Sequence, residues 1–295
     1  MDLFQSTLNR PPSGTEIWRR ETLDLGTLPP LGARIYGKRV SGENRPLALH
    51  FHGGAFVGGS LEQDYLVARL LAEAGAVVIS LDYPLAPEHP FPIAVEAGLE
   101  ALAWIHADEN RSGLGGRASK VYVAGEEAGG NLAAAVAMAA RDRQGPKLSG
   151  QILISPMLNP ALATASMREA NAGASGCRFA AGWCQYLSKL SDADHPYAVP
   201  GTAARLSGLP MTLLLTASDD PMRDDTIAYA LRLREAGVEV DEALLPGPTG
   251  WPCSLMNQDE CLPAWAADIR RRLENYFESI KAAQANTPAS ASLSI

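Results

Sequence analysis

The feature that most constrains the fold of this chain is a regular alternation of short apolar runs and longer amphipathic runs. Strands are expected at 21–25, 33–40, 47–52, 76–83, 120–125, 150–155, 211–217 and 238–246. Helices are expected at 62–75, 91–105, 130–142, 221–237 and 262–283. This strand–helix order predicts an α/β fold, with a mostly parallel central sheet and helices on both faces.

One segment interrupts the alternation. Residues 157–206 carry weak helical patterns and no clear strand. An insertion of this length usually covers the carboxyl ends of the strands, so we expect a helical cap there. With 295 residues and 46% hydrophobic content, the whole chain is expected to form a single domain carrying this cap. The small, polar tail at 284–295 is expected to be disordered.

Composition and charge indicate which partners, location and cysteine state to expect. The net charge is −8 and the isoelectric point is about 5.2, so nucleic acid is not expected as a partner. No apolar run reaches the roughly 18 residues that a membrane span needs. The first residues have no signal-peptide layout, so we expect a cytoplasmic location. The four cysteines form no C-x-x-C pair and are expected to be reduced thiols.

Three turns are expected at the carboxyl ends of the strands, where ligands bind in open α/β sheets. The first contains Gly53 and Gly54, whose N–H groups can point at a developing oxyanion. The second, 125–130, has the glycine spacing of a nucleophile elbow, with Glu127 at its centre. The third contains Asp220, at a position typical of the acid in a catalytic triad.

The motifs "HFHGGAFVGGS", "DYPLAPEHPFP", "GEEAGGNLAAA" and "DDPMRDDTIAYALRLREAGV" occur in an order and spacing that resemble the hormone-sensitive-lipase family of α/β-hydrolases. The resemblance extends from about residue 30 to 280. It implies an α/β-hydrolase fold and an oxyanion hole formed by the N–H groups of Gly53, Gly54 and Ala128. It places the family's serine nucleophile on Glu127 and the triad histidine on Thr249, and it keeps the triad acid as Asp220.

These departures remove the usual chemistry of a serine hydrolase, which needs a hydroxyl nucleophile and a base. The hydroxyl of Thr249 does not titrate near neutral pH and is no base. All five histidines precede Asp220 in the chain. Cys253 lies four residues after Thr249, but a thiol nucleophile would also need a histidine or a cation beside it.

The sequence leaves two roles open for Glu127. Its carboxylate can enter the oxyanion hole and fill it, which blocks chemistry. Alternatively, if Asp220 lies within about 6 Å, one acid of the pair is held protonated, and Glu127 becomes a usable acid or base.

Three functions follow from these roles. The leading hypothesis is a non-hydrolytic acid/base enzyme of the lyase, isomerase or cyclase type, acting on a small carbonyl-containing metabolite, with Glu127 and Asp220 as catalytic residues. The family resemblance allows this, since its plant branches include dehydratases, cyclases and a hormone receptor. The alternatives are an inactive ligand- or partner-binding pseudo-hydrolase, and a carboxylic ester hydrolase that works by an unrecognised route.

The remaining expectations concern the pocket and its partners. We expect a small-molecule ligand or substrate in a pocket lined by His52, Phe56, Glu126, Trp183, Tyr186 and Trp251. We expect no metal, because the resemblance explains His52 as part of the oxyanion loop, and no cofactor. A homodimer is expected by analogy with other proteins of this fold.

Overall fold

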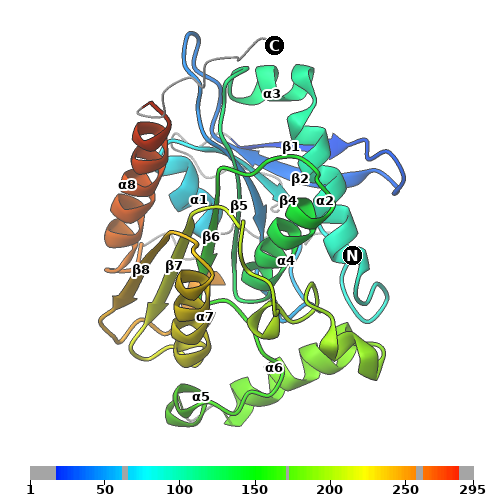
Figure 1. Cartoon of the computed structure of the whole chain (residues 1–295), viewed down its shortest axis with the longest axis vertical. Coiled ribbons are helices and arrows are strands. Elements are labelled where there is room, and N and C mark those ends of the chain that lie inside the picture. Colours follow the sequence, from blue (N-terminus) through cyan, green and yellow to red (C-terminus); the bar gives the residue numbers. More distant parts are fainter. Residues whose placement is uncertain (1–17, 62–65, 171–172, 257–261, 286–295) are drawn as a thin grey trace, which may run out of the picture.

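An eight-stranded sheet forms the centre of the computed structural model, which describes residues 18–61, 66–170, 173–256 and 262–285 (Figure 1). The strands are β1 (Trp18–Leu23), β2 (Leu31–Tyr36), β3 (Leu47–Phe51), β4 (Val77–Leu81), β5 (Val121–Glu126), β6 (Gly150–Ile154), β7 (Thr212–Ala217) and β8 (Val240–Leu245). Their spatial order is β1-β2-β4-β3-β5-β6-β7-β8. The β1–β2 and β2–β4 pairs are antiparallel and the others are parallel, which confirms the predicted mostly parallel sheet.

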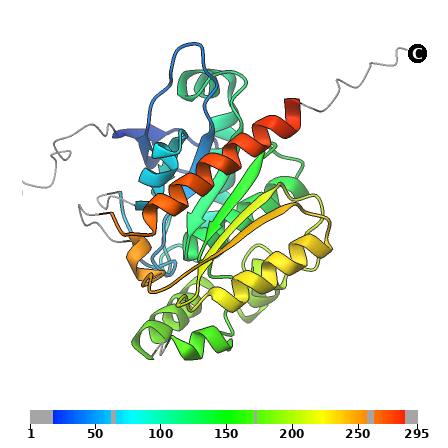
Figure 2. The ribbon, with the colours of Figure 1, turned by 90° about the vertical axis from the view of Figure 1, so that its left-hand side faces the viewer.

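Helices cover both faces of this sheet. One face packs against α1 (Leu66–Glu73) and α8 (Ala266–Ala285), and Figure 2 shows α8 lying across the strands. The other face packs against α2 (Ile93–His106), α4 (Ala128–Asp142) and α7 (Arg223–Glu235). A short helix, α3 (Asp108–Leu114), follows α2 and was not expected from the sequence.

The two faces carry separate apolar cores because successive side chains of a strand point to opposite sides. In β4, Val77 and Ile79 belong to the core beneath α2 and α4, whereas Val78 belongs to the core beneath α1 and α8. All five residues of β4 are buried, as expected for a strand covered on both faces.

The segment between β6 and β7 contains α5 (Ala165–Glu169), α6 (Gly173–Tyr186) and two 3₁₀ turns, η1 (Leu190–Asp194) and η2 (Pro200–Thr202). Figure 1 shows α5 and α6 together at the lower end of the molecule, beneath α4 and α7. A third 3₁₀ turn, η3 (Cys253–Met256), lies between β8 and α8. The tail that was expected to be disordered falls, from residue 286 onward, outside the described residues. Within the described part of the chain, no helix has the length and apolarity needed to cross a membrane.

Candidate active site

The elbow between β5 and α4 brings Glu127 to the carboxyl end of the sheet. Glu127 directly precedes α4 and has a positive φ of 53°, a strained conformation for a residue with a side chain. The first turn of α4 packs so closely on the end of β3 that a Cβ at Gly129 would overlap with the carbonyl oxygen of Phe51. A glycine is therefore required there, and the tight turn holds Glu127 beside the loop that follows β3.

The carboxylate of Glu127 is fully buried and has both oxygens hydrogen-bonded. Its Oε2 accepts from the backbone N–H of Gly54 and from that of Ala55, the latter at 2.8 Å. Its Oε1 accepts from the Arg178 guanidinium at 2.7 Å. Glu127 therefore occupies the position that an oxyanion would take, which is the first of the two roles that the sequence left open. The backbone donors to this carboxylate are thus Gly54, which was expected, and Ala55, which the sequence did not indicate in place of Ala128.

Glu126 holds the same loop in place through a hydrogen bond from the loop's backbone. Its Oε1 accepts from the backbone N–H of Gly53 at 3.0 Å, so this N–H, which we expected to face the oxyanion, is taken by Glu126 instead. Its Oε2 lies 2.8 Å from Nε2 of His50, and Nδ1 of His50 lies 2.9 Å from the hydroxyl of Ser80. Glu126 and His50 are both completely buried. Glu126 therefore positions the oxyanion loop rather than lining a pocket.

His52 is neutral in this site. Burial lowers the pKa of its imidazole to about 4, and the ring stacks on Tyr83 at a centroid separation of 4.4 Å. The Nδ1–H group donates to the carbonyl oxygen of Gly53 at 2.7 Å, which further orders the loop. Among the described residues, no three His, Cys, Asp or Glu side chains are grouped so that they could hold a metal ion.

Asp220 lies in a separate, buried network. Its carboxylate accepts from the Ser155 hydroxyl at 2.8 Å, the Thr216 hydroxyl at 2.7 Å and the Met222 N–H at 2.9 Å. Burial raises the pKa of Asp220 to about 6 despite these donors, and the charge of Asp219 adds to the rise. Glu127 and Asp220 thus accept from different donors, and no hydrogen bond joins their two carboxyl groups in the described part of the chain.

Asp219, which the sequence did not indicate as a site residue, contacts the loop that carries Thr249. Its Oδ1 accepts from the Thr249 hydroxyl at 2.8 Å, and its Oδ2 accepts from the N–H groups of Thr249 and Gly250 at 2.7 and 2.9 Å. Partial burial raises the pKa of Asp219, but the donors of Gly250 and Thr249 outweigh this and lower it below the usual value. The acid that faces the predicted histidine position is therefore Asp219.

Three of the predicted aromatic pocket residues pack against one another, and the fourth, Trp251, lies elsewhere. Phe56 stacks on Tyr186 at 4.0 Å and contacts Trp183 at 4.9 Å, and all three are buried. Their contacts join α6 to the oxyanion loop. Trp251 packs edge-on against Trp265 at 5.3 Å, in the core on the α8 side of the sheet.

Arg178 also contacts Glu127 and was not indicated by the sequence. It lies on α6, 51 positions from Glu127, and its side chain is 40% exposed. The same guanidinium nitrogen lies 4.0 Å from the sulfur of Cys253. No local pattern marks this arginine, because its partner is known only once the segment between β6 and β7 has been placed over the strand ends.

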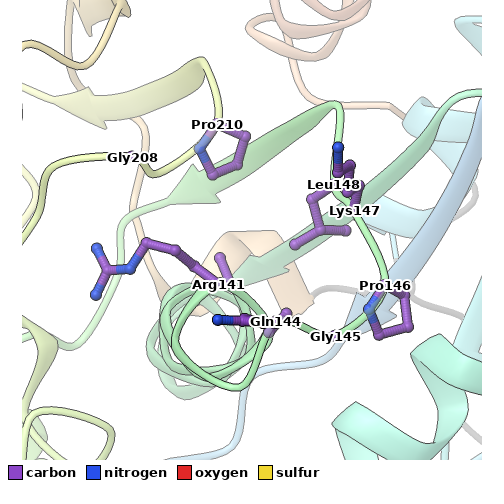
Figure 3. Close-up of a pocket in the computed structure, with 10 residues that line it drawn as sticks. Arg141, Gln144, Gly145, Pro146, Lys147, Leu148, Gly208 and Pro210 are labelled. Carbon is purple, nitrogen blue, oxygen red and sulfur yellow. The ribbon is translucent and has the colours of Figure 1, made fainter. Parts of the chain in front are cut away.

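A cavity of about 420 Å³ lies away from this site, at the far end of α4 (Figure 3). Its wall is mainly apolar, with Pro146, Leu148 and Pro210 around the last turn of the helix, and Arg141 and Lys147 supply its positive charges. A smaller cavity of about 160 Å³ is lined in part by Asp219 and Asp220. The second cavity, unlike the first, is lined by a residue that the sequence predicts to be catalytic, Asp220.

Comparisons with known proteins agree with the fold described above. A family model described as the alpha/beta hydrolase fold matches residues 48–249. The carboxylesterase NlhH of Mycobacterium tuberculosis is 39% identical over 227 residues, covering 75% of this chain and 70% of the relative. A solved structure of a hyperthermophilic esterase from Pyrobaculum calidifontis has a TM-score of 0.75 and 35% identity, covering 94% of this chain and 88% of that one. The gibberellin receptor GID1 of Oryza sativa is 34% identical over 208 residues, covering 66% of this chain and 57% of the receptor.

These similarities correct the leading functional hypothesis. The prediction of a non-hydrolytic acid/base enzyme of the lyase, isomerase or cyclase type is wrong, because the similar proteins named above are a carboxylesterase, an esterase and a receptor, and none is a lyase, isomerase or cyclase. The findings favour the alternative that the sequence also allowed, a carboxylic ester hydrolase.

Proposed function

Because the chain belongs to the alpha/beta hydrolase fold family, whose model matches residues 48–249, we propose that it is a carboxylic ester hydrolase in which Glu127 activates water. The sheet order and the esterase structures confirm the α/β-hydrolase fold. In this proposal, Glu127 stands where the family pattern has its serine, and it acts as a general base rather than as a nucleophile.

The observation that carries the proposal is the convergence of two backbone donors on one oxygen. The N–H groups of Gly54 and Ala55 both point at Oε2 of Glu127. Preorganised donors of this kind stabilise the negative oxygen that develops when an ester carbonyl is attacked. The loop is also braced by Glu126 through Gly53, so the donors keep their direction when the occupant changes.

Hydrolysis would begin when Glu127 rotates out of the hole and the ester carbonyl oxygen replaces Oε2. Glu127 then takes a proton from a water molecule while the water oxygen bonds to the carbonyl carbon. The negative carbonyl oxygen accepts from the N–H groups of Gly54 and Ala55. When the carbonyl re-forms, the bond to the alcohol oxygen breaks, and the leaving alkoxide takes the proton that Glu127 holds. The products are one acid and one alcohol, and Glu127 is again a carboxylate.

The rate should be modest, for two reasons. A positioned base contributes about 10²–10⁴-fold to the rate, and this route has no covalent intermediate to add to it. Withdrawing Glu127 also breaks its contacts with Arg178 and the loop, and breaking a buried ion pair costs about 3–5 kcal/mol when the charge left behind has no partner. Because Arg178 is 40% exposed, water screens its charge and the cost here is lower.

The test is the hydrolysis of 4-nitrophenyl acetate by the wild type, Glu127→Gln and Glu127→Ala. We expect the wild type to exceed the buffer rate by about 10²–10⁴-fold and both variants to fall to the buffer rate. Glutamine keeps the size of the side chain without its basicity, and alanine empties the hole. Circular dichroism of each variant controls for folding.

The outcomes separate the roles of Glu127. A faster reaction with Glu127→Ala than with the wild type would make Glu127 a plug and remove it as the base. Undiminished hydrolysis with Glu127→Gln would assign the base to another residue. A wild type that only matches the buffer would contradict the hydrolase proposal.

A second candidate function is ligand binding without turnover. It is favoured by the same carboxylate. Glu127 fills the oxyanion hole and accepts from three donors, so the hole is closed to an ester in the described structure. The gibberellin receptor among the similar proteins is consistent with a binding role for this fold. Retention of a small ester without its conversion to acid and alcohol, followed by mass spectrometry, would select this candidate.

A further inference from the structure

We propose that the alcohol part of the ester carries an anionic group, which pairs with Arg178. This inference rests on the proposed function for the chemical class of the substrate, but its central claim is a binding claim that can be measured separately. It starts from the way the chain occupies its own site.

The Glu127 carboxylate in the oxyanion hole resembles a bound ester group. A carboxylate group and an ester group share the arrangement of two oxygens on one carbon. Oε2 takes the place of the ester carbonyl oxygen, because it accepts from the N–H groups of Gly54 and Ala55. Oε1 then takes the place of the alcohol oxygen, and the Cγ of Glu127 takes the place of the acyl chain. Arg178, which donates to Oε1 at 2.7 Å, therefore lies on the alcohol side of a bound ester.

Arg178 has donors to offer a ligand. One terminal nitrogen makes the contacts with Glu127 and Cys253, while the other terminal nitrogen and Nε make no hydrogen bond with a described residue. The guanidinium carbon lies 4.8 Å from the ring centroid of Phe179, the next residue of α6. With 40% of its side chain exposed, the guanidinium stands at the entrance of the site rather than inside the hole. A planar carboxylate is the ligand that such a fork binds best.

The acids near the site are already engaged by donors. Glu126 faces Gly53 and His50, and Asp219 faces the loop at Thr249. Asp220 accepts from three donors in its own network. An anion at Arg178 thus meets a guanidinium whose only ionic partner among the described residues is Glu127.

Pairing of the anionic ester with Arg178 would also favour the movement of Glu127 out of the oxyanion hole. A neutral ester can enter only by separating Glu127 from Arg178 and leaving the guanidinium without a carboxylate. An anionic ester supplies a replacement carboxylate at the same moment, so Arg178 keeps a partner after Glu127 has moved. The chain should therefore prefer anionic to neutral esters of equal size, and Arg178 should be the origin of that preference.

The experiment compares two acetate esters that differ only in charge, the acetyl esters of 4-hydroxybenzoate and of 4-hydroxybenzamide. For each, kcat/KM is divided by the hydroxide-catalysed rate in buffer, which removes the difference in leaving-group reactivity. The variants are Arg178→Gln, which removes the charge, and Arg178→Lys, which keeps it without the fork. We expect the wild type to favour the anionic ester by about fivefold, a ratio near one for Arg178→Gln, and an intermediate ratio for Arg178→Lys.

A binding measurement keeps this test independent of turnover. Isothermal titration compares 4-acetamidobenzoate with 4-acetamidobenzamide, which have the same shapes as the two esters but a stable amide bond. Tighter binding of the benzoate by the wild type but not by Arg178→Gln supports the inference even if neither ester is hydrolysed, in which case only the hydrolase proposal fails. Equal binding of the two amides by the wild type, or a preference for the benzoate that persists in Arg178→Gln, overturns the inference even where both esters are hydrolysed.

Discussion

At the scale of single residues, one carboxylate decides what this site can do. Glu127 satisfies the oxyanion-loop donors and the guanidinium of Arg178 at once, so the site is closed by its own side chain. Elsewhere in the site, two neighbouring acids, Asp219 and Asp220, have different hydrogen-bond partners. Asp219 faces Thr249, whereas Asp220 is enclosed by hydroxyl and N–H donors at the end of β7.

The different partners of Asp219 and Asp220 predict which substitutions would give the protein a serine-hydrolase mechanism. We expect Glu127→Ser alone to show no acyl-enzyme burst with 4-nitrophenyl acetate, because Thr249 supplies no base. Adding Thr249→His should produce such a burst, measured by stopped-flow absorbance, because the imidazole supplies the missing base. In that double variant, Asp219→Asn should reduce the burst rate more than Asp220→Asn does, because Asp219 lies 2.8 Å from the position 249 side chain. A burst in the single variant would contradict the assignment of position 249.

The sequence could indicate some of these residues and not others. Glu127 and the loop at Gly54 were predicted together because the glycine spacing of each turn is local. Arg178 was missed because its contact spans 51 positions and depends on where α6 lies. Asp219 and Asp220 are adjacent, and a difference of one residue reverses which side chain faces the loop at Thr249. Only the structure resolves that choice.

At the scale of elements, α6 and the oxyanion loop form one packed unit. A Cβ on Gly182 would overlap with the carbonyl oxygen of Ala55, so the helix rests directly on the loop backbone. Phe56 stacks on Tyr186 from the same helix, and the N–H of Phe91 donates to the carbonyl oxygen of Tyr186 at 2.9 Å. The position of Arg178 over Glu127 follows from this packing.

The close approach predicts the effect of one added methyl group. Gly182→Ala should push α6 away from the loop, reduce the free energy of unfolding by about 1–3 kcal/mol, and lower the protection of the backbone amides in both segments. Urea unfolding measures the first effect, and hydrogen exchange of α6 and the oxyanion loop measures the second.

A matched control is Gly113→Ala in α3. A Cβ at Gly113 meets no atom within 4 Å, so alanine should stabilise that helix by about 0.5–1 kcal/mol. If both substitutions stabilise the protein, or if hydrogen exchange in α6 is unchanged by Gly182→Ala, then α6 does not rest on the loop in solution as described.

At the scale of the whole molecule, burial of acids gives folding a distinct dependence on pH. The pKa of Asp220 is about 6 in the folded protein against 3.8 for an ordinary aspartate, and Asp225 is raised to a similar value by burial. Between pH 4 and 6 the folded state holds a proton on Asp220 that the unfolded state has released. The contribution of this group to stability therefore falls as pH rises through that window.

The expected outcome is a change in the stability of Asp220→Asn relative to the wild type. Between pH 4 and 7 the variant should gain up to about 3 kcal/mol on the wild type, because asparagine carries no charge to bury. Chemical denaturation at several pH values measures this difference. A constant difference between the two proteins across the range would show that Asp220 titrates normally.

Most of the fold could be predicted from the sequence, because most of the parallel strands are short apolar runs and the covering helices bury an apolar face. The predicted strand at 76–83, for example, contains β4 (Val77–Leu81). What escaped prediction was α3, whose seven residues carry only one buried side chain, Leu114, and therefore no periodic pattern. The spatial strand order and the antiparallel β2–β4 pairing also depend on contacts between distant segments.

The filled oxyanion hole has a consequence for how this chain can evolve. Because Glu127 satisfies the N–H groups of Gly54 and Ala55 as the protein folds, the order of that loop is part of the stability of the native state. A substitution that opens the hole for a substrate also leaves those donors unsatisfied. An exchange of Glu127 for a shorter nucleophile such as serine is therefore expected to begin with a loss of stability, which compensating substitutions elsewhere would have to offset.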